Sequence, residues 1–304
     1  MSDELRFSKY QGTGNDFVVV EDLLDERRIH ADDAVALCHR RFGVGADGTI
    51  RITGPGSAAA RETAATQDVD PERAQFFMDH RNADGTTSEM CGNGIRCLAA
   101  YVRDKGLDGG DHLDVLTRSG IKHLRVSDRD GELSVSVSMG VPRFPRASIP
   151  MRGPAWEPFL NEPFELGSGI TMKASAVSMG NPHLVLFTDD DPARVHVSHI
   201  GAALEQHELF PERTNVEFVA VDGDELSVRV WERGVGETMA CGTGACAALV
   251  AANEAGLIGP RAVVRFPGGP VTVERRDDGD VTLTGPAVHV YDGIVNPARL
   301  LRPS

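Results

Sequence analysis

Two stretches of the sequence decide the fold: Met90-Cys91-Gly92-Asn93-Gly94-Ile95-Arg96-Cys97 and Ala240-Cys241-Gly242-Thr243-Gly244-Ala245-Cys246. Each places a cysteine directly before a Gly-x-Gly turn that opens a predicted helix. The two leading cysteines lie 150 residues apart in a chain of 304 residues. This spacing predicts a duplicated domain whose two copies face each other across a cleft.

The rest of the chain fits two copies of an α+β domain. Short alternating apolar runs, bounded by Gly, Asp and Asn, predict many strands. Few helices interrupt them, and the clearest are 31–41, 92–104, 198–205 and 244–253. Since 304 residues exceed what one core usually sustains, we expect two pseudo-symmetric domains. Each would be a curled, mostly antiparallel sheet wrapped around a central helix, with an active site in the interdomain cleft.

The domain boundary is expected where prolines accumulate. Six of them lie between Pro142 and Pro163, which disfavours regular strand pairing and suggests a crossover near residue 140. We therefore expect an N-terminal domain of residues 1–139 plus 287–304 and a C-terminal domain of residues 140–286. The small, polar segment 53–70 has no periodicity and is predicted to be a mobile surface insertion without a role in chemistry.

Composition narrows the classes of partner. The net charge of −14 argues against binding to nucleic acid or to an acidic membrane surface, because both need clustered Lys and Arg. The sequence has no apolar run of membrane-spanning length and no signal segment at its N-terminus, so we expect a cytoplasmic protein. A small polar or zwitterionic molecule is the expected partner.

Five cysteines in a chain of this kind are expected to be reduced thiols. The spacings C-x5-C and C-x4-C do not fit a structural zinc site, so no metal is expected. Cys38, Cys97 and Cys246 are interpreted as small buried core residues. For Cys91 and Cys241, the repeated sequence context favours a functional role instead.

A cysteine at a helix N-terminus feels the partial positive charge of unpaired N–H groups, so both leading thiols are predicted to ionise below their ordinary pKa. The N–H groups that follow them, at Gly92, Asn93, Gly242 and Thr243, are candidates to hold a carboxylate. Two thiols on opposite sides of one carbon can remove a proton from one face and return it to the other. The pattern therefore predicts a racemase or epimerase that needs no cofactor.

Five motifs in order resemble those of the diaminopimelate epimerase family. Besides the two cysteine motifs, they are Gly12-Thr13-Gly14-Asn15-Asp16-Phe17, Met179-Gly180-Asn181-Pro182-His183 and Trp231-Glu232-Arg233-Gly234. The resemblance covers the chain apart from 53–70. It implies interconversion of LL- and meso-2,6-diaminopimelate without pyridoxal phosphate, in lysine and peptidoglycan precursor synthesis, and it implies a homodimer.

The resemblance also implies roles for individual residues. Cys91 and Cys241 would be the acid/base pair, and His183 and Glu232 would tune their pKa values. The substrate would be bound by Asn15, Asn82, Gly92, Asn93, Asn181, Asn215, Glu232, Arg233, Gly242 and Thr243. Which cysteine is the resting thiolate stays open. Taken singly, Asn82 and Asn215 also fit residues at turn or strand boundaries, and Glu232 and Arg233 also fit a solvated pair.

The sequence departs from the family at one position. The segment Gly43-Val44-Gly45-Ala46-Asp47-Gly48 ends in glycine, where the family usually has a substrate-contacting glutamine. A contact is therefore missing or supplied elsewhere. The same segment matches G-x-G-x-x-G, but it follows a predicted helix and precedes a strand, which is the reverse of a dinucleotide-binding turn.

Three alternatives remain open. A proline or hydroxyproline racemase would share the fold and the cysteine pair, although that family resembles Cys-Gly-His at the first helix, where this chain has Asn93. A thiol redox or metal-binding module would depend on Cys97 and Cys246 as strongly as on the leading cysteines. A binding protein without chemistry would show affinity for a ligand without exchange of its Hα.

Overall fold

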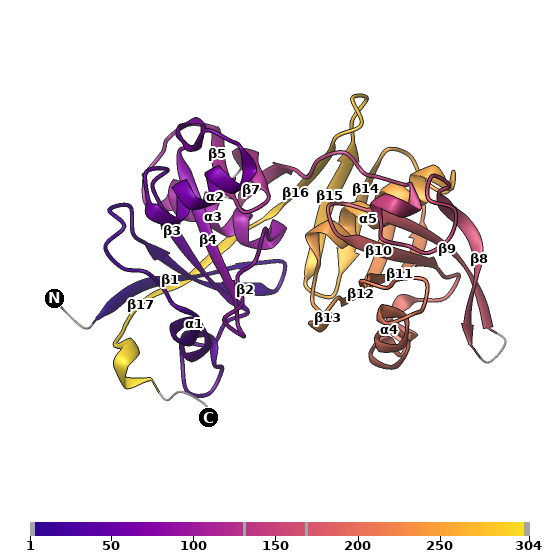
Figure 1. Ribbon diagram of the computed structural model, residues 1–304, viewed down its shortest axis with the longest axis horizontal. Helices are drawn as coiled ribbons and strands as arrows, with labels where there is room; N and C mark the ends of the chain where they lie inside the picture. The colour runs from indigo at the N-terminus through magenta and orange to yellow at the C-terminus, as the bar shows by residue number, and fades with distance from the viewer. Residues whose placement is uncertain (1–3, 130–131, 168–169, 301–304) are drawn as a thin grey trace. The chain divides into compact units, whose positions relative to one another are not determined.

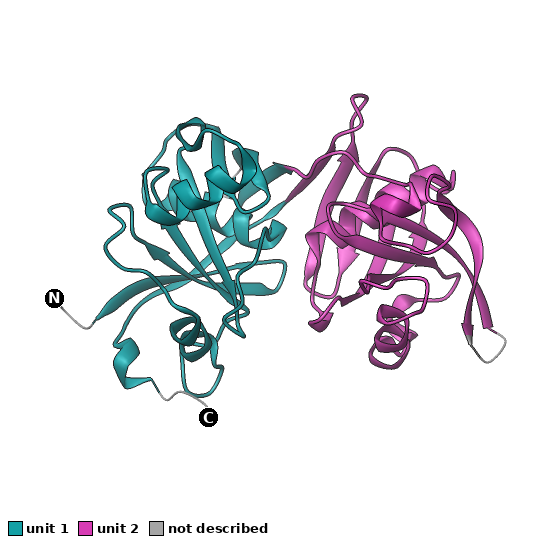
Figure 2. Ribbon diagram, viewed as in Figure 1, with its two compact units in different colours: residues 1–137, 285–304 teal, residues 138–284 magenta. Residues whose placement is uncertain are grey.

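The computed structural model describes residues 4–129, 132–167 and 170–300 (Figure 1). Contacts between Cα atoms divide the chain into two compact units (Figure 2). Unit 1 comprises residues 1–137 and 285–304, and unit 2 comprises residues 138–284. The C-terminal segment therefore returns to the unit in which the chain begins. The domain limits expected from the sequence, 139/140 and 286/287, lie within two residues of these.

In unit 1, the strands pair in the order β17-β1-β2-β3-β4-β5-β6-β7. The pairs β2–β3 and β4–β5 are parallel, and the other neighbours are antiparallel. The strand bounds are β1 Leu5–Gly12, β2 Asn15–Glu21, β3 Gly48–Thr53, β4 Phe76–Asn82, β5 His112–Thr117, β6 Gly120–Arg129, β7 Glu132–Ser138 and β17 Val288–Val295.

In unit 2, the order is β8-β9-β10-β11-β12-β14-β15-β16, with the short β13 on β12. Here β10–β11 and β12–β14 are the parallel pairs. The bounds are β8 Phe159–Gly167, β9 Ile170–Ser178, β10 Pro182–Phe187, β11 Asn215–Asp222, β12 Glu225–Glu232, β13 Gly236–Thr238, β14 Arg261–Phe266, β15 Gly269–Arg275 and β16 Val281–Pro286. Read from β17 and from β8, the two units therefore have the same sequence of parallel and antiparallel neighbours.

Each sheet curls around one helix that follows a leading cysteine. Helix α3 (Gly92–Asp104) packs against β1, β2, β3, β4, β6 and β17 of unit 1, and α5 (Gly242–Glu254) packs against β8, β9, β10, β11, β12, β14 and β15 of unit 2. Nearly every residue of both helices is buried. Such helices need small or apolar side chains on all sides, which explains the Gly- and Ala-rich sequence of α5. The predicted α+β class, with a curled and mostly antiparallel sheet around a central helix, is confirmed.

A second helix lies on the outside of each unit: α1 (Ala31–Cys38) and α4 (Val197–Glu205). Helix α1 ends three residues earlier than the sequence predicts. The reason is His39, whose backbone is extended and whose Nδ1 accepts hydrogen bonds from the N–H groups of Arg41 and Phe42. Those N–H groups are no longer available to continue the helix.

The segment 53–70 is not the irregular, mobile insertion that its composition predicts. It forms helix α2 (Ala58–Gln67), which is capped by Ser57 through a hydrogen bond from the N–H of Ala60. Alanines on one face of α2 pack with Phe77 and Leu116 in a core cluster of unit 1. Alanine is the strongest helix former, yet it gives a weak apolar signal, so a search for large apolar residues misses this helix.

Helix α2 and the short 3₁₀ helix η1 (Pro71–Arg73) join β3 to β4. In unit 2, the corresponding strands β11 and β12 are joined by Gly223 and Asp224 alone. The segment is therefore an insertion relative to the other unit, although an ordered one.

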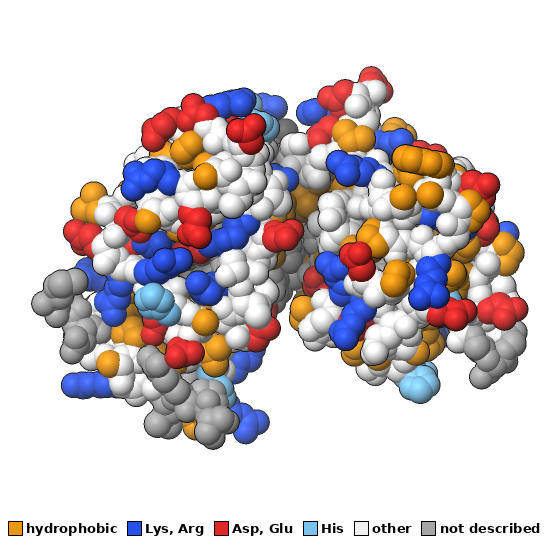
Figure 3. All heavy atoms as spheres, viewed as in Figure 1, with side chains coloured by type: hydrophobic (Ala, Val, Ile, Leu, Met, Phe, Trp, Pro, Cys, Tyr) orange, Lys and Arg blue, Asp and Glu red, His pale blue; other side chains and the backbone are white. Residues whose placement is uncertain are grey.

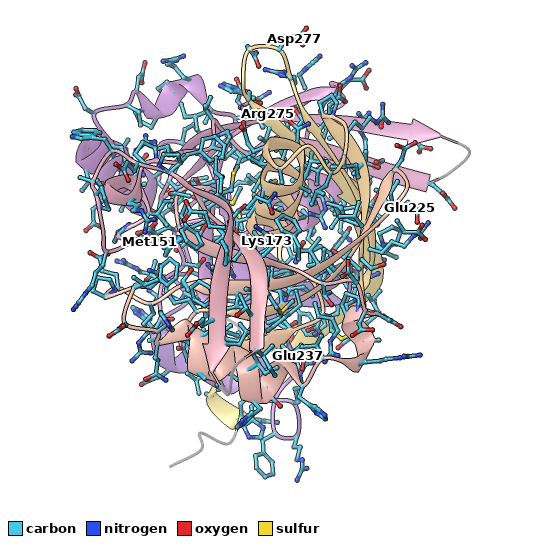
Figure 4. The ribbon with its side chains drawn as sticks, turned by 90° about the vertical axis from the view of Figure 1, so that its right-hand side faces the viewer. Met151, Lys173, Glu225, Glu237, Arg275 and Asp277 are labelled. Atoms are coloured by element: carbon cyan, nitrogen blue, oxygen red, sulfur yellow. The ribbon has the colours of Figure 1, made fainter. Side chains whose placement is uncertain are left out.

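Three short 3₁₀ helices complete the fold: η2 (Arg146–Ser148), η3 (Pro192–Arg194) and η4 (Pro297–Arg299). Of the helices in the described ranges, none is long and apolar enough to cross a membrane. On the face drawn in Figure 3, acidic and basic side chains are interspersed over both units. In Figure 4, which looks onto unit 2, Lys173 lies on β9 at the front and Asp277 at the tip of the β15–β16 hairpin.

Candidate active site

The leading cysteines occupy equivalent positions in the two units. Cys91 is the N-cap of α3, and Cys241 is the N-cap of α5, both with extended backbones. In each, the sulfur accepts a hydrogen bond from the N–H of the glycine three residues on, Gly94 or Gly244, over 3.4 Å. A cysteine in this position replaces the usual Ser or Asp cap, so its sulfur lies beside the N–H groups of the first helical turn.

In unit 1, Cys91 contacts a substrate-binding candidate. Its sulfur lies 3.8 Å from Oδ1 of Asn15, which also accepts a hydrogen bond from Nδ2 of Asn93 over 3.5 Å. The amide nitrogen of Asn15 donates to the carboxylate of Asp47 over 2.8 Å. Because Asp47 can only accept, it turns the amide so that the oxygen of Asn15 faces Cys91.

Asn82 and Gly48 are directly opposite each other in the β3–β4 pair. The Nδ2 of Asn82 donates to Oγ1 of Thr86 over 3.0 Å. A Cβ atom on Gly48 would lie 2.7 Å from the carbonyl oxygen of Arg81 and 2.8 Å from Nε2 of His80. This packing gives a reason for glycine at position 48: a side chain would have no room there.

In unit 2, four side chains form a continuous series that ends at Cys241. The sulfur lies 3.5 Å from Oγ1 of Thr243, which accepts from Nδ2 of Asn181 over 3.4 Å. Oδ1 of Asn181 lies 3.0 Å from Nε2 of His183. On its other side, Nδ1 of His183 lies 2.7 Å from Oε1 of Glu217. His183 and Glu217 are both fully buried.

The predicted lowering of the thiol pKa is wrong for Cys241. Burial raises its pKa well above the ordinary value, and the carboxyl groups of Glu232 and Glu217 act in the same direction when they are ionised. The hydrogen bonds from Thr243 and from the N–H of Gly244 act in the opposite direction, but they are the smaller influences. The helix N-terminus is present as expected, and desolvation outweighs it.

The remaining candidates of unit 2 lie around the end of β11 and β12. Nδ2 of Asn215 donates to the carbonyl of Pro182 over 2.8 Å, and its Oδ1 accepts from the N–H of Arg233 over 2.9 Å. Glu232 accepts from the hydroxyl of Thr238. The side chain of Arg233 is exposed, and its Nη1 donates to the carbonyl of Glu212. Asn215 therefore holds the turn that presents Arg233.

Cys97 and Cys246 are fully buried within α3 and α5, and Cys38 is buried at the end of α1. Burial raises the pKa of the Cys97 thiol, so it stays protonated and acts as a packing group. Within the described residues, no group of three or more His, Cys, Asp and Glu side chains is arranged to hold a metal ion.

Sequence reasoning missed Asp47 and Glu217. Asp47 was read only as part of a glycine-rich turn, and Glu217 as part of an apolar strand. A period of two along β11 would have revealed Glu217, because it lies two residues after Asn215 and therefore on the same face of the strand.

The architecture recurs among solved structures. A hydroxyproline epimerase from Agrobacterium vitis, solved with bound trans-4-hydroxy-L-proline, has a TM-score of 0.66 over 99% of this chain and 94% of that one, at 15% identity. A PhzF-family phenazine biosynthesis protein from Bacillus anthracis has a TM-score of 0.65 over 97% and 99%, at 14% identity. These likenesses establish the fold.

Sequence comparison identifies the family. The diaminopimelate epimerase profile matches residues 7–145 and 175–290. Diaminopimelate epimerases of Moorella thermoacetica and Desulforudis audaxviator are 43% and 46% identical to the chain, each over 95% of this chain and 98% of the relative. The chain belongs to the diaminopimelate epimerase family, and it is an isomerase of the epimerase type. The resemblance seen in the motifs is confirmed.

Proposed function

We propose that the protein interconverts LL- and meso-2,6-diaminopimelate by a two-thiol acid/base mechanism. Family membership supports the reaction, and one observation supports the mechanism: the same N-cap cysteine stands before the central helix of each unit. A proline racemase reading has less support, since the similarity to the hydroxyproline epimerase is confined to the fold at 15% identity.

In the proposed reaction, one cysteine is a thiolate and the other a thiol when substrate binds. The thiolate takes Hα, and the electron pair that is left behind spreads into the neighbouring carboxylate. The thiol then donates its proton to the opposite face of the same carbon. One S–H bond forms as one breaks, so the reverse reaction starts from the opposite protonation state and no external oxidant or reductant is needed.

The charge that develops on the carboxylate needs donors that are already in place. The backbone N–H groups of Gly92, Asn93, Gly242 and Thr243 belong to the first turns of α3 and α5 and are the proposed donors. The first N–H groups of an α-helix precede its i→i−4 hydrogen bonds, so an anion bound at these positions leaves the helical hydrogen bonds intact.

The other end of the substrate carries a second amino group and a second carboxylate. The exposed guanidinium of Arg233 suits the distal carboxylate because it can donate two parallel hydrogen bonds. Asn15, Asn82, Asn181 and Asn215 suit the amino groups because an amide both donates and accepts. Glu232 is proposed to bind an ammonium group and, with His183, to bias the thiol pKa values.

Several finer statements belong to the same proposal. We propose that the two compact units act as the two epimerase domains and that the enzyme needs no pyridoxal phosphate. We further propose that it is a cytoplasmic homodimer serving lysine and peptidoglycan precursor synthesis.

The proposal is tested by incubating the protein with LL-diaminopimelate and, separately, with L-proline in deuterium oxide. Solvent deuterium should enter the Hα position of diaminopimelate as the meso isomer forms, detected by NMR and chiral chromatography. Deuterium entering proline alone would refute the substrate. Binding of diaminopimelate without any exchange would refute the reaction.

A further inference from the structure

The two units differ beneath their leading cysteines. The parallel pairs β2–β3 and β10–β11 have matching register, which places Phe17 opposite Gly48 and His183 opposite Asn215. Two residues further on, Ile50 in unit 1 corresponds to Glu217 in unit 2. Unit 1 therefore has an apolar pair where unit 2 has a buried ionisable pair.

The side chain of Glu217 is in an unusual state for a carboxyl group. It is 0% exposed, and within the described residues its Oε2 has no hydrogen-bond partner. An ionised carboxylate with one bare oxygen in a dry interior is costly, whereas a neutral carboxyl group is far less so. Burial accordingly raises the pKa of Glu217, although His183 opposes the shift. A neutral Glu217 donates its O–H to Nδ1 of His183, 2.7 Å away.

That hydrogen bond determines which way the rest of the series points. With Nδ1 accepting, the ring proton of a neutral His183 lies on Nε2, which donates to Oδ1 of Asn181. The amide nitrogen of Asn181 is then directed at Oγ1 of Thr243. The hydroxyl proton of Thr243 remains for the sulfur of Cys241, 3.5 Å away.

We propose that Glu217 is a positioning residue that acts through His183 and Asn181 to keep the hydroxyl of Thr243 donating to the sulfur of Cys241. This deepens the two-thiol mechanism proposed above and rests on it. A donor at the sulfur favours the thiolate, so Glu217 would assist the half-reaction in which Cys241 is the base. In unit 1, by contrast, Asp47 turns the oxygen of Asn15 toward Cys91.

Among the described residues, the titratable groups that act on Glu217 or on Cys241 include His183 on β10 and Glu232 on β12, and Cys241 itself stands at the start of α5. Glu217 can therefore affect Cys241 in two opposite ways. As an ionised group, its charge would raise the pKa of Cys241, and its removal would lower that pKa. As a neutral positioning group, its removal would raise the pKa of Cys241, because the sulfur loses its donor.

The test measures the thiol directly. The rate of alkylation by iodoacetamide is followed against pH, and mass spectrometry of peptides separates Cys241 from Cys91, which serves as the internal reference. The variants are Glu217→Ile, His183→Phe and their combination, which give unit 2 the pair that unit 1 already packs. Glu217→Gln completes the set, because its amide N–H can replace the O–H of a neutral Glu217.

Glu217→Ile should raise the pH midpoint for alkylation of Cys241 by about one unit and leave that of Cys91 unchanged, as expected for the loss of one hydrogen bond to an ionised group. Glu217→Gln should stay close to the parent. In the His183→Phe background, Glu217→Ile should add no further shift, since coupled residues show non-additive effects. In turnover of diaminopimelate, Glu217→Ile should lower kcat roughly tenfold with little change in KM.

If the pH midpoint for alkylation of Cys241 is lower in Glu217→Ile than in the parent, Glu217 is charged and the proposal is overturned. If this midpoint is unchanged, Glu217 has no positioning role. A Glu217→Gln variant as impaired as Glu217→Ile would overturn the neutral donor. The matched control is His80→Val, which removes an equally buried histidine of unit 1 and introduces the residue that unit 2 has at the same register, Val230.

The control should leave the Cys241 midpoint unchanged, and a shift equal to that of Glu217→Ile would also overturn the proposal. Thermal unfolding checks that each variant is folded. If Glu217→Ile alone does not fold, the test uses its combination with His183→Phe instead. Because alkylation needs no substrate, its outcome is independent of whether the parent protein epimerises diaminopimelate.

Discussion

Oε1 of Glu217 lies 2.8 Å from the position that a Cβ atom would take on Gly244. At the equivalent Gly94 in unit 1, a Cβ would instead approach the terminal carbons of Met78 and Ile50 at 3.0 and 3.1 Å. The first turns of α3 and α5 are therefore supported from below by different chemistry: flexible apolar chain ends in one unit, and a fixed, hydrogen-bonded carboxyl group in the other.

This difference predicts unequal effects of the same substitution. Gly244→Ala should destabilise the protein by about 1–3 kcal/mol, because Glu217 cannot move without breaking its hydrogen bond to His183. Gly94→Ala should cost less, since Met78 and Ile50 can yield and alanine is favoured over glycine in a helix by about 1 kcal/mol. Urea unfolding of the two variants is the measurement, and equal losses would contradict this account.

The ion pairs of the buried Arg51 in unit 1 are predicted to be important for stability. Its guanidinium is buried and donates to Asp22 over 2.8 Å, with Asp25 and Asp79 completing the group. Arg51→Met should cost about 3–5 kcal/mol, because it leaves the buried carboxylate of Asp22 without a counter-charge, whereas Asp79 keeps Arg118.

The control for Arg51→Met is Arg265→Met, which breaks an exposed pair with Glu225, a residue visible at the edge of unit 2 in Figure 4. Arg265→Met should unfold at the same urea concentration as the parent protein. If both variants unfold at the same urea concentration as the parent, burial of the Arg51 cluster contributes nothing to stability.

His80 should make the protein sensitive to mild acid. Burial, followed by the positive charge of Arg118, lowers its pKa from 6.5 to about 4. The unfolded chain therefore takes up a proton at higher pH than the folded one, and stability falls as the pH drops from about 6.5 towards 4. The loss should approach about 3 kcal/mol, a value set by the shift of roughly two and a half pKa units.

The measurement is the free energy of unfolding between pH 7 and pH 4 for the parent and for His80→Val. The variant should show a flatter dependence on pH, even if it is less stable throughout because of the lost volume. Parallel curves for the two proteins would show that His80 does not titrate as its burial implies.

The two cysteines of each motif should be separable by function. Cys91→Ser and Cys241→Ser should each reduce Hα exchange at least about a hundredfold, the usual contribution of a positioned acid or base. Cys97→Ala and Cys246→Ala should retain most activity and lose stability instead, because both side chains are fully buried. Loss of exchange in Cys97→Ala equal to that in Cys91→Ser would favour a dithiol redox module.

Much of the fold follows from local sequence signals. Helix α3 was expected at residues 92–104 and has those bounds, because Cys91 caps it and its apolar residues recur at helical spacing. The alternation along β12 likewise marks a strand with one buried face, whereas the first five residues of β11 are buried on both faces. Helix α2 was not predicted, because the alanines on its buried face give too weak an apolar pattern.

The candidate site was predicted less completely. The motifs named Cys91, Cys241 and their asparagines as candidates, since those residues stand at turns and helix ends whose local sequence is distinctive. Glu217 and Asp47 were not predicted as site residues, because their roles depend on partners that are distant along the chain, His183 and Asn15 respectively. The direction of the pKa shift of Cys241 was predicted wrongly for a similar reason: a helix end is visible in the sequence, whereas the depth of burial is not.

The turn at Gly223 and Asp224 occupies the place where unit 1 accommodates helix α2 between paired strands. In unit 1, the equivalent β3–β4 hairpin accommodates this insertion with the same pairing register as β11–β12. A reporter peptide or an affinity tag inserted after Gly223 would follow the same route, which makes this turn a favourable place for labelling the protein internally.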